Sequence, residues 1–408
     1  MTRGTTVYGL TYDAWNRPLE TKVGNVALST NEYDTTTRLL KKVTYANGFE
    51  VRYVYDELDR VTEIYEKYSN TEALAYEFQY NNEGDLYALR NWKTSRVSFF
   101  EYDHAGRCMA CTEYAFTVVN DLVTLGSKLS GYMYEYDPNN NLTKLTCNAA
   151  GGSWETVYTY DKDNRTVTAT FANGKVLTVT YDAIGRVTKR RLGLTSNYET
   201  DLTYVPGYDG SQTALLSTYQ NGSDDAYEYA YDDNGNITSI TQGTTSVTYQ
   251  YNGANELIRE NTAFTNQTVT YTYDSWGNLT AKSVYAYTTA TDPGTPTDTK
   301  TYTYSTGDWK DQLVSYGNRT IAYDAMGNPT TYRGKTLTWR GKQLTGIAAG
   351  TDVISYSYDE NGLRLQKTVN NVATDYYYNG SVLIGLVKGN DTLRFSYDAA
   401  GQVAMVEY

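Results

Sequence analysis

The chain has few of the residues from which catalytic and metal sites are usually built. Its 408 residues include one histidine, His104, and three cysteines, Cys108, Cys111 and Cys147. A serine–histidine or cysteine–histidine catalytic pair could therefore involve only His104, and no nucleophile motif accompanies it. Three cysteines are also too few, and an odd number, for a secreted scaffold held together by disulfides.

Concentrated positive charge and long apolar runs are missing as well. The formal net charge is −12, and the densest basic group is Lys189, Arg190 and Arg191. Nucleic acids and anionic membranes are recognised through a concentrated basic surface, so neither is expected as a partner. No apolar run approaches the roughly 20 residues of a membrane span. The segment from Met1 to Leu10 lacks the basic and apolar parts of an export signal, so any such signal would lie outside these residues.

Tyrosine dominates what is present. There are 44 tyrosines against 8 phenylalanines and only 6 prolines. Tyrosine and threonine favour β-strands that are buried on one face. We therefore expect an all-β protein with rows of half-buried aromatic side chains, and not a helical one.

One short pattern recurs along the whole chain: an aromatic residue, any residue, Tyr, Asp, two residues, Gly or Asn, Arg or Asn, and an aliphatic residue. Residues 271–279 and 229–237 are good copies, and residues 179–187 form a third with Val179 in the first aromatic place. About eighteen units with a usual period of roughly 19 to 25 residues can be recognised, which is typical of a repeat architecture. No stretch is left for a separate domain, so residues 1–408 are expected to form a single continuous array that belongs to a larger protein.

The Tyr, the Asp and the later Gly or Arg define the repeat, and their expected role is structural. In the clearest copies these residues are Tyr12, Asp13, Tyr55, Asp56, Tyr102, Asp103, Gly106, Tyr136, Asp137, Tyr160, Asp161, Tyr181, Asp182, Gly185, Arg186, Tyr231, Asp232, Gly235, Tyr273, Asp274, Gly277, Tyr323, Asp324, Gly327, Tyr358, Asp359, Gly362, Tyr397, Asp398 and Gly401. A further strict copy lies at Tyr33, and degenerate copies lie at Tyr80, Tyr204, Tyr251, Tyr304, Trp339 and Tyr378.

Each unit has a direct physical interpretation. The alternating aromatic residues share one face of a strand, where they can stack on neighbouring strands. The Asp opens a turn by accepting backbone N–H bonds, and the residue three positions later must be left-handed, as in a type I turn with a bulge. Residues that enter this region readily occupy the position in most units: Gly84, Gly106, Gly185, Gly235, Gly277, Gly327, Gly362, Gly401, Asn16, Asp59, Asn140, Asn164, Asn255 and Asp308. Units with Thr37, Tyr208, Gln343 or Val382 at this position must turn differently.

Some units carry a second turn or an unusual spacing. Asn47-Gly48 and Asn173-Gly174 predict a second hairpin turn, so that a unit contributes about two strands. The long spacings in 102–136 and 273–304 predict protruding loops, where partner contacts are most expected; the second contains Asp-Pro-Gly-Thr-Pro at 292–296. The stretch 181–231 is expected to hold a poorly matched unit around Tyr204.

Residues 181–186, Tyr-Asp-Ala-Ile-Gly-Arg, and residues 323–328, Tyr-Asp-Ala-Met-Gly-Asn, show most clearly that the chain resembles the YD-repeat or RHS-repeat family. This family includes bacterial polymorphic toxins, shell components of insecticidal toxin complexes, and teneurins. The resemblance implies an array of β-hairpins in a spiralling sheet, an open or partial hollow β-cocoon. In bacterial relatives such a shell encloses a C-terminal effector, whereas other members are adhesive. The family's C-terminal core, with paired Asp-Pro-x-Gly motifs and self-cleaving aspartates, has no counterpart here, so closure and autoproteolysis are not implied.

Two sets of side chains could be mistaken for metal sites. His104, Cys108 and Cys111 have the spacing His-x3-Cys-x2-Cys, with Cys147 as a conceivable fourth zinc ligand. A Cys-x-x-Cys segment on a strand, however, points its sulfurs to opposite faces. The segments 161–164 and 232–234 resemble calcium loops but lack the closing bidentate carboxylate. We therefore expect no metal and no cofactor, and turn chemistry for these aspartates.

The favoured interpretation is a non-catalytic scaffold, part of an RHS-type shell that encapsulates a C-terminal effector or toxin domain. Its partner is then its own polypeptide, and its location is secreted or at the cell surface. The alternative is an adhesion or carbohydrate-binding module with glycans or a surface receptor as partner. Tyrosines could stack on sugars, but we expect them to stack within the ladder with their hydroxyls in water. An enzyme is disfavoured because a fold without a site gives no warrant for activity. Both chain ends are expected to cut through the array, so exposed edges and self-association are expected there.

Overall fold

The structure is a computed structural model that describes residues 2–3, 6–193, 198–398 and 401–408. In these residues the chain forms strands throughout, with one short 3-10 helix and no α-helix. The predicted all-β hairpin array is therefore confirmed. No helix in the described part is long and apolar enough to cross a membrane.

The strands follow one another in chain order. The first fourteen are β1 Thr2–Arg3, β2 Thr6–Tyr12, β3 Pro18–Val23, β4 Val26–Tyr33, β5 Leu40–Tyr45, β6 Glu50–Tyr55, β7 Val61–Tyr68, β8 Thr71–Tyr80, β9 Leu86–Asn91, β10 Arg96–Tyr102, β11 Cys108–Val119, β12 Leu122–Tyr136, β13 Leu142–Ala149 and β14 Gly152–Tyr160. The next fourteen, interrupted by the 3-10 helix η1 Tyr208–Gly210, are β15 Thr166–Phe171, β16 Val176–Tyr181, β17 Val187–Leu192, β18 Tyr198–Pro206, β19 Gln212–Asn221, β20 Tyr227–Tyr231, β21 Ile237–Gln242, β22 Thr245–Tyr251, β23 Leu257–Thr262, β24 Gln267–Tyr273, β25 Leu279–Ala286, β26 Asp298–Tyr304, β27 Leu313–Tyr316 and β28 Arg319–Thr320. The last ten are β29 Ala322–Tyr323, β30 Pro329–Tyr332, β31 Lys335–Arg340, β32 Gln343–Ala349, β33 Asp352–Tyr358, β34 Arg364–Val369, β35 Val372–Asn379, β36 Val382–Lys388, β37 Asp391–Tyr397 and β38 Val403–Glu407.

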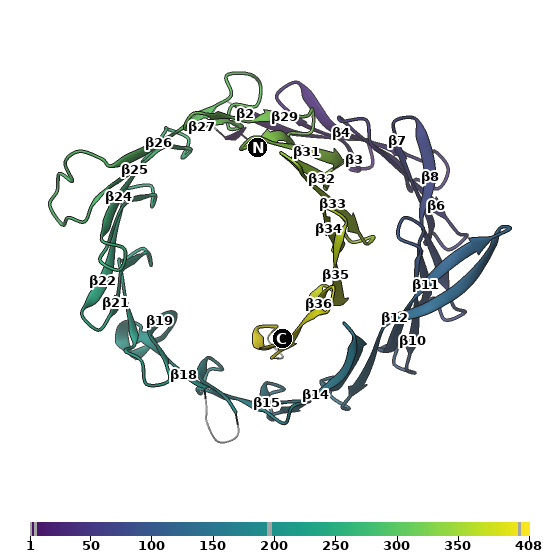
Figure 1. Ribbon diagram of the computed structural model, residues 1–408, viewed down its shortest axis with the longest axis horizontal. Helices are drawn as coiled ribbons and strands as arrows, with labels where there is room; N and C mark the ends of the chain where they lie inside the picture. Colours follow the sequence, from purple (N-terminus) through teal and green to yellow (C-terminus); the bar gives the residue numbers. More distant parts are fainter. Residues whose placement is uncertain (1, 4–5, 194–197, 399–400) are drawn as a thin grey trace. The chain divides into compact units, whose positions relative to one another are not determined.

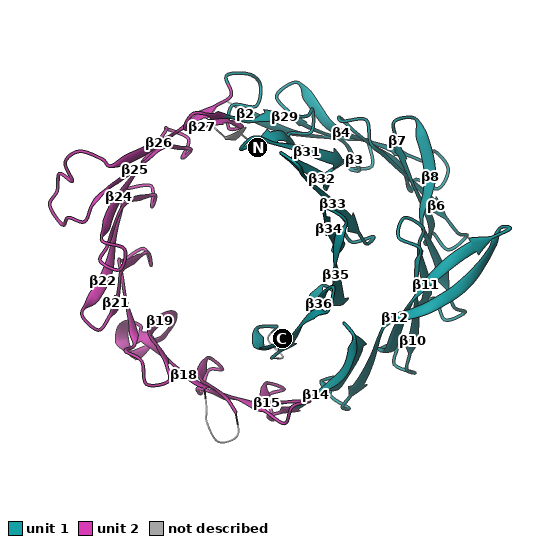
Figure 2. Cartoon of the chain, viewed as in Figure 1, with its two compact units in different colours: residues 1–158, 306–310, 320–408 teal, residues 159–305, 311–319 magenta. Residues whose placement is uncertain are grey.

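The chain divides into two compact units, coloured separately in Figure 2. Unit 1 contains Met1–Tyr158, Thr306–Lys310 and Thr320–Tyr408, and unit 2 contains Thr159–Ser305 and Asp311–Arg319. The same hairpin repeat builds both units. Figure 1 shows the order of the strands by colour along the chain.

Neighbouring strands within each unit pair antiparallel, and the pairing has an irregularity at the motif tyrosine. Thr11 lies opposite Glu20, but Tyr12 lies opposite Pro18, so the register shifts at Tyr12. The same shift occurs at Tyr55, Tyr102, Tyr231 and Tyr273. The extra residue is a β-bulge, as expected for a type I turn followed by a left-handed residue.

The left-handed residue lies where the repeat predicts it in almost every unit. All the predicted glycines have a positive φ, and so do Asn16, Asp59, Asn140, Asn164 and Asn255. Asp308 does not, so the prediction there is wrong. The connection from β26 to β27 is longer, with Ser305 donating to the carbonyl of Gln312, and Asp308 instead packs on Gly24 within unit 1.

All four exceptional units turn by other means, as expected. Arg38 takes the left-handed conformation in place of Thr37, which makes that turn one residue longer. Asp209 and Gly210 are left-handed in place of Tyr208. In the Gln343 unit, Arg340 pairs directly with Gln343, and Gly341 is left-handed inside a two-residue turn. In the Val382 unit, Asn379 pairs directly with Val382, and Gly380 is left-handed inside a two-residue turn.

The two long spacings have different structures. In 102–136 the predicted loop is wrong, because β11 and β12 are long strands that extend the hairpin to a tight turn at Asn120-Asp121, where both residues have positive φ. In 273–304 the predicted loop is confirmed and covers residues 287–297 between β25 and β26. The poorly matched unit around Tyr204 is also confirmed as the hairpin β18–β19.

Both units bury apolar and polar side chains. In unit 1 the ten-stranded sheet β29–β38 forms a second layer against the N-terminal strands. Ile384 of β36 joins a core with Tyr132, Cys147 and Trp154 of β12–β14. Tyr76 of β8 also donates its hydroxyl to the carbonyl of Asp359 at 2.9 Å. In unit 2 two polar side chains are buried: Thr268 is 0% exposed and Arg259 is 6% exposed.

Replacing Gly235 by alanine tests the left-handed turn. Gly235 has φ +82°, and a Cβ added at this position would meet open space, so Gly235→Ala adds backbone strain and no steric contact. We expect a loss of about 1–2 kcal/mol in the free energy of unfolding, measured by urea denaturation. Gly253→Ala is the matched control, because Gly253 also has open space but no positive φ. Equal effects of the two substitutions would contradict this account of the turn.

Candidate functional site

The aspartate of each motif organises its own turn. In the copy at Asp56, the backbone N–H groups of Leu58 and Arg60 donate to Oδ1 at 2.9 and 3.0 Å. The N–H of Asp59 donates to the carbonyl of Asp56 at 3.2 Å and closes the turn. One carboxylate oxygen therefore satisfies two amide donors that the turn would otherwise leave to water.

The other carboxylate oxygen accepts a bond from the residue four positions later. Its donor is an arginine Nε or an asparagine Nδ2, at 2.6 to 2.9 Å. The pairs are Asp13–Arg17, Asp56–Arg60, Asp103–Arg107, Asp161–Arg165, Asp182–Arg186, Asp137–Asn141, Asp232–Asn236, Asp274–Asn278 and Asp324–Asn328. The hydrogen bond from Arg60 lowers the pKa of Asp56, so this carboxyl stays charged and keeps its partner.

Two units exchange the two chemical groups. Asn252 donates its Nδ2 to Oε2 of Glu256 at 2.6 Å, and Asn81 has the same arrangement with Asp85 at 3.5 Å. The amide now comes first and the carboxylate four residues later. The sequence pattern included this Arg or Asn but did not assign it a partner. The exchange of the amide and the carboxylate between the two positions indicates that the two side chains are in direct contact.

In most units the motif tyrosine is bonded to the unit before it. The Tyr273 hydroxyl donates to the carbonyl of Leu257 at 2.8 Å, and Leu257 is the aliphatic residue that follows the preceding turn. Equivalent bonds join Tyr33 to Pro18, Tyr55 to Leu40, Tyr80 to Val61, Tyr102 to Leu86, Tyr136 to Cys108, Tyr181 to Thr166, Tyr204 to Val187, Tyr231 to Leu216, Tyr251 to Ile237, Tyr304 to Leu279, Tyr358 to Leu344 and Tyr397 to Leu383. The expectation that these hydroxyls point into water is therefore wrong.

The arginine that binds the motif aspartate also contacts the next unit. The guanidinium carbon of Arg17 lies 4.2 Å from the ring centre of Tyr33, within cation–π distance. Arg60, Arg107, Arg165 and Arg186 lie over the next motif tyrosine in the same way, at 4.3 to 5.0 Å. In these five places the aspartate, the arginine and the next motif tyrosine are in contact in series. We call the bond from a motif tyrosine to a carbonyl of the preceding hairpin, with or without the arginine, the repeat lock.

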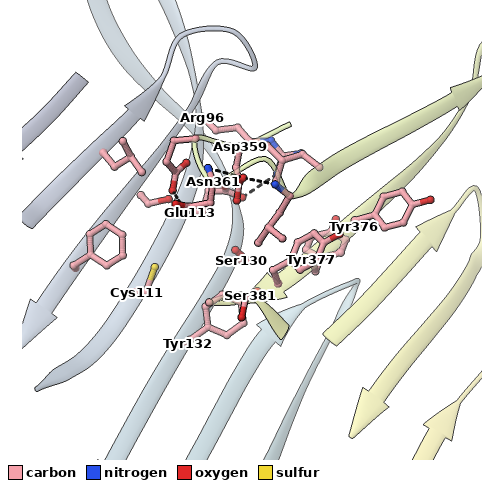
Figure 3. Close-up of a pocket in the computed structure, with 18 of the residues that line it drawn as sticks. Arg96, Cys111, Glu113, Ser130, Tyr132, Asp359, Asn361, Tyr376, Tyr377 and Ser381 are labelled. Atoms are coloured by element: carbon pink, nitrogen blue, oxygen red, sulfur yellow. Dashed lines mark hydrogen bonds and ion pairs between the residues drawn. The ribbon is translucent and has the colours of Figure 1, made fainter. Parts of the chain in front are cut away.

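Unit 1 also contains a partly open cavity between its two layers. The cavity has a volume of ≈ 590 Å³ and is lined by strands β8–β12 on one side and by the β33–β34 turn and β35 on the other. Figure 3 shows Arg96, Glu113 and Ser130 facing Asp359, Asn361 and Tyr376 across it. Its size is that of a small-molecule site.

The aspartate at this cavity departs from the other turns. Leu363 occupies the position four residues after Asp359, and its side chain cannot donate a hydrogen bond. The backbone N–H groups of Asn361 and Leu363 still donate to Oδ1 at 3.0 and 2.7 Å. Burial raises the pKa of Asp359, and burial together with the nearby Asp359 charge raises the pKa of Glu360 to about 7. The cavity therefore holds carboxyl groups that are costly to ionise.

The remaining groups of the cavity are held in their ordinary protonated or paired forms. Glu113 forms an ion pair with Arg96 at 3.0 Å, and burial nevertheless raises its pKa. Burial raises the pKa of Cys111 to about 12 and also raises the pKa of Tyr132. At neutral pH Cys111 is therefore a thiol, and a thiol is a poor nucleophile.

The structure sets His104 apart from the cysteines, whereas Cys111 packs against the apolar core that contains Cys147. His104 lines a different cavity, with Glu83, Asp85 and Asp103, whereas Cys111 lines the cavity between the layers. Cys147 lies in the apolar core beside Trp154. Among the residues that the structure describes, no group of three or more His, Cys, Asp or Glu side chains is placed to hold a metal ion.

The first calcium-like segment is used within its own turn. Arg165 contacts the carboxylates of Asp161 at 2.7 Å and Asp163 at 3.1 Å. Both carboxylates thus share one guanidinium within the turn.

The loop at residues 287–297 is anchored to unit 2 by a buried arginine. Arg259 donates to the carbonyls of Thr288 at 2.9 Å and Thr291 at 3.0 Å, and to Oδ1 of Asn261 at 2.8 Å. Thr268 also donates to the carbonyl of Thr288 at 3.0 Å. The start of the loop therefore has a defined conformation.

Comparison with known proteins agrees with the repeat motif. A family described as RHS Repeat matches residues 231–267, which contain the motif at Tyr231-Asp232. The "tRNA nuclease WapA" of Bacillus subtilis is 35% identical over 134 residues, or 32% of this chain. Residues 231–267 are therefore an RHS, or YD, repeat, and the same Tyr-Asp motif recurs along the chain.

Other relatives place these RHS repeats among large proteins. Mouse "Teneurin-3" is 23% identical over 230 residues, or 55% of this chain and 8% of its own length. The chain spans only about 5% of the length of the WapA relative. It therefore corresponds to a small part of each of these relatives.

Solved structures show the same fold over almost the whole RHS chain. The structure titled "Crystal Structure of TcdB2-TccC3-Cdc42" covers 96% of this chain with a TM-score of 0.63 at 17% identity. The structure of TcdB2-TccC3 without its hypervariable C-terminal region covers 96% with a TM-score of 0.62. In both cases the match uses 22% of the other chain. The likeness shows a shared fold.

Removing one hydroxyl tests the repeat lock. Tyr273→Phe leaves the ring in place but removes the donor to Leu257, and we expect a loss of about 1 kcal/mol in the free energy of unfolding. Tyr208→Phe is the control, because Tyr208 is 89% exposed. Urea denaturation of the two variants should separate them. A Tyr273→Phe chain as stable as the control would show that the hydroxyl bond contributes nothing.

The carboxyl groups of the cavity predict a pH dependence. The pKa of Glu360 rises from 4.5 to about 7 on folding, so its ionisation opposes folding above about pH 7 and this cost disappears below pH 4.5. Glu360→Gln should stabilise unit 1 by roughly 2 kcal/mol at pH 8 and have little effect at pH 4.5. Unfolding at both pH values measures this difference.

Glu57→Gln is the matched control for this measurement. Glu57 follows Asp56 as Glu360 follows Asp359, but it is exposed to solvent. Its substitution should give the same small effect at both pH values. A Glu360→Gln effect that does not change with pH would contradict the assigned burial of this carboxyl.

Proposed function

We propose that this chain is a non-catalytic segment of a shell that encloses a C-terminal effector or toxin domain of the same polypeptide. The observation that carries the proposal is the repeat lock, which joins hairpin to hairpin with bonds between side chains and backbone. A wall built in this way can separate a passenger from its surroundings without any reacting group. The likeness to TcdB2-TccC3 structures and to the WapA nucleases supports this use of the repeat.

The proposal assigns the rest of the protein as the main partner. The array is one continuous scaffold within a larger secreted or cell-surface protein, and the remaining shell and the enclosed domain are its contacts. The lock residues maintain the wall and take no part in chemistry. The cavity of unit 1 also supports a structural role, because its thiol and phenol are kept protonated.

Adhesion through sugar-stacking tyrosines is the weaker alternative. Stacking on a sugar requires an accessible ring, but the motif tyrosines lie half-buried, with their hydroxyls bonded to the preceding unit and several rings covered by arginine. These side chains are already used by the wall.

Protease protection in the complete natural polypeptide tests the enclosure. We expect the segment that follows the array to resist a broad-specificity protease under native conditions and to become sensitive at the urea concentration that unfolds the array. The same segment expressed without the array is the control and should be digested at once. Combining Tyr55→Phe with Tyr273→Phe should lower the urea concentration at which protection is lost. Equal digestion with and without the array, or a reading frame without a downstream domain, would refute enclosure.

A further inference from the structure

One hairpin of unit 1 extends beyond both of its neighbours. Strand β10 pairs with β11 only as far as Ala115, and β13 pairs with β12 only from Gly131 onward. The outer part of the hairpin, Thr117–Leu129, is therefore a two-stranded ribbon, which we call the arm. Figure 1 shows β11 and β12 extending past the adjacent hairpins.

The long edge of the arm has no strand beside it. Within the described part of the chain, residues 122–129 of β12 pair only with β11. The opposite edge therefore presents backbone N–H and C=O groups that only another strand can pair in register. An edge of this kind is usually protected by proline, by several charges or by β-bulges. Strand β12 carries two extra residues between Leu125 and Ser130, so its edge is bulged there, whereas residues 122–125 pair regularly with β11. The arm contains no proline, and Lys128 is the single charge along this edge.

The arm also exposes apolar side chains. Val119 and Leu122 lie opposite each other near the turn and are 61% and 68% exposed. On the other face, Val118 and Leu125 are 47% and 51% exposed and continue from the buried Phe116, whose ring packs on Trp92. A free two-stranded ribbon with this much exposed apolar surface gains stability when another strand covers it.

The charges indicate which partner fits. The chain as a whole carries −12, whereas the arm carries one aspartate, Asp121, and one lysine, Lys128. Two copies that meet through their arms bring together nearly neutral surfaces. Antiparallel pairing also places Asp121 of each copy near Lys128 of the other, because these residues lie at opposite ends of the edge. An anionic membrane would instead repel the acidic chain.

We propose that the arm is a self-association site, at which β12 of one copy pairs antiparallel with β12 of a second copy through residues 122–129. Such pairing is isologous, so it closes as a dimer with two-fold symmetry. The backbone bonds set the register, and Leu122 and Leu125 supply the buried apolar area. This site is independent of what the wall encloses.

Sedimentation of the full 408-residue chain at increasing concentration tests the site. We expect a monomer–dimer equilibrium, and Leu122→Lys should weaken it at least about tenfold, because the pairing would then have to cover a charge in place of an apolar side chain. Leu58→Lys is the matched control, since Leu58 is equally exposed, at 71%, but lies in a motif turn away from the arm. A chain that stays monomeric throughout, or equal effects of the two substitutions, would overturn the proposal.

Hydrogen exchange provides a second measurement that does not depend on a variant. Amides on the free edge of residues 122–129 should exchange more slowly as the chain concentration rises, while those of the terminal strand β38 should not change. Protection of β38 without protection of the arm would assign the association to the end of the array and overturn the proposal. A dimer with unchanged exchange in both segments would also overturn it.

Discussion

The bond from a motif tyrosine to a carbonyl of the preceding hairpin, present in most units, is the contact on which the array depends. A lone two-stranded hairpin is barely stable in water, so each unit must obtain its stability from neighbours. The hydroxyl of Tyr273 and the carbonyl of Leu257 meet only in one register, because moving a strand by one residue would turn the ring to the other face. The bond therefore selects one pairing among the many that similar repeats could form.

The aspartate makes this tyrosine bond reproducible. Asp56 fixes the turn through two backbone amides, and its second oxygen holds Arg60, which in turn covers the ring of Tyr80. The carboxylate thus determines both the shape of one hairpin and the position of the next ring. Asp359 lacks such a side-chain partner, and it lies where unit 1 packs a second layer against the strands. The motif thus loses its Arg or Asn at the turn that packs against the other layer of unit 1.

Much of the local structure could be predicted from the sequence. The left-handed residue was predictable because few residue types other than glycine and asparagine adopt a positive φ readily, as Gly235 and Asn16 do. The two strands of each unit were predictable from the alternation of aromatic and polar residues. Asp308 was mispredicted because its position in the pattern did not reveal a longer connection. The arm was mistaken for a loop because its Asn120-Asp121 turn was overlooked inside a long spacing.

Contacts between distant segments could not be predicted in the same way. Tyr76 and Asp359 are separated by 283 positions, and nothing in either motif identifies the other as its partner. The cavity and its carboxyl groups result from that packing, so the pattern alone did not indicate them. The role of the fourth residue after the aspartate was within reach, since Asn252 and Glu256 exchange the two groups that Asp232 and Asn236 carry.

The tyrosine bond also gives the array a direction. The acceptor carbonyl always precedes the donor hydroxyl in the chain, as Leu40 precedes Tyr55. During synthesis from the N-terminus, each hairpin therefore emerges when the surface that receives it is already complete. The wall can then be extended one unit at a time, and every finished unit serves as the template for the next without waiting for the end of the chain.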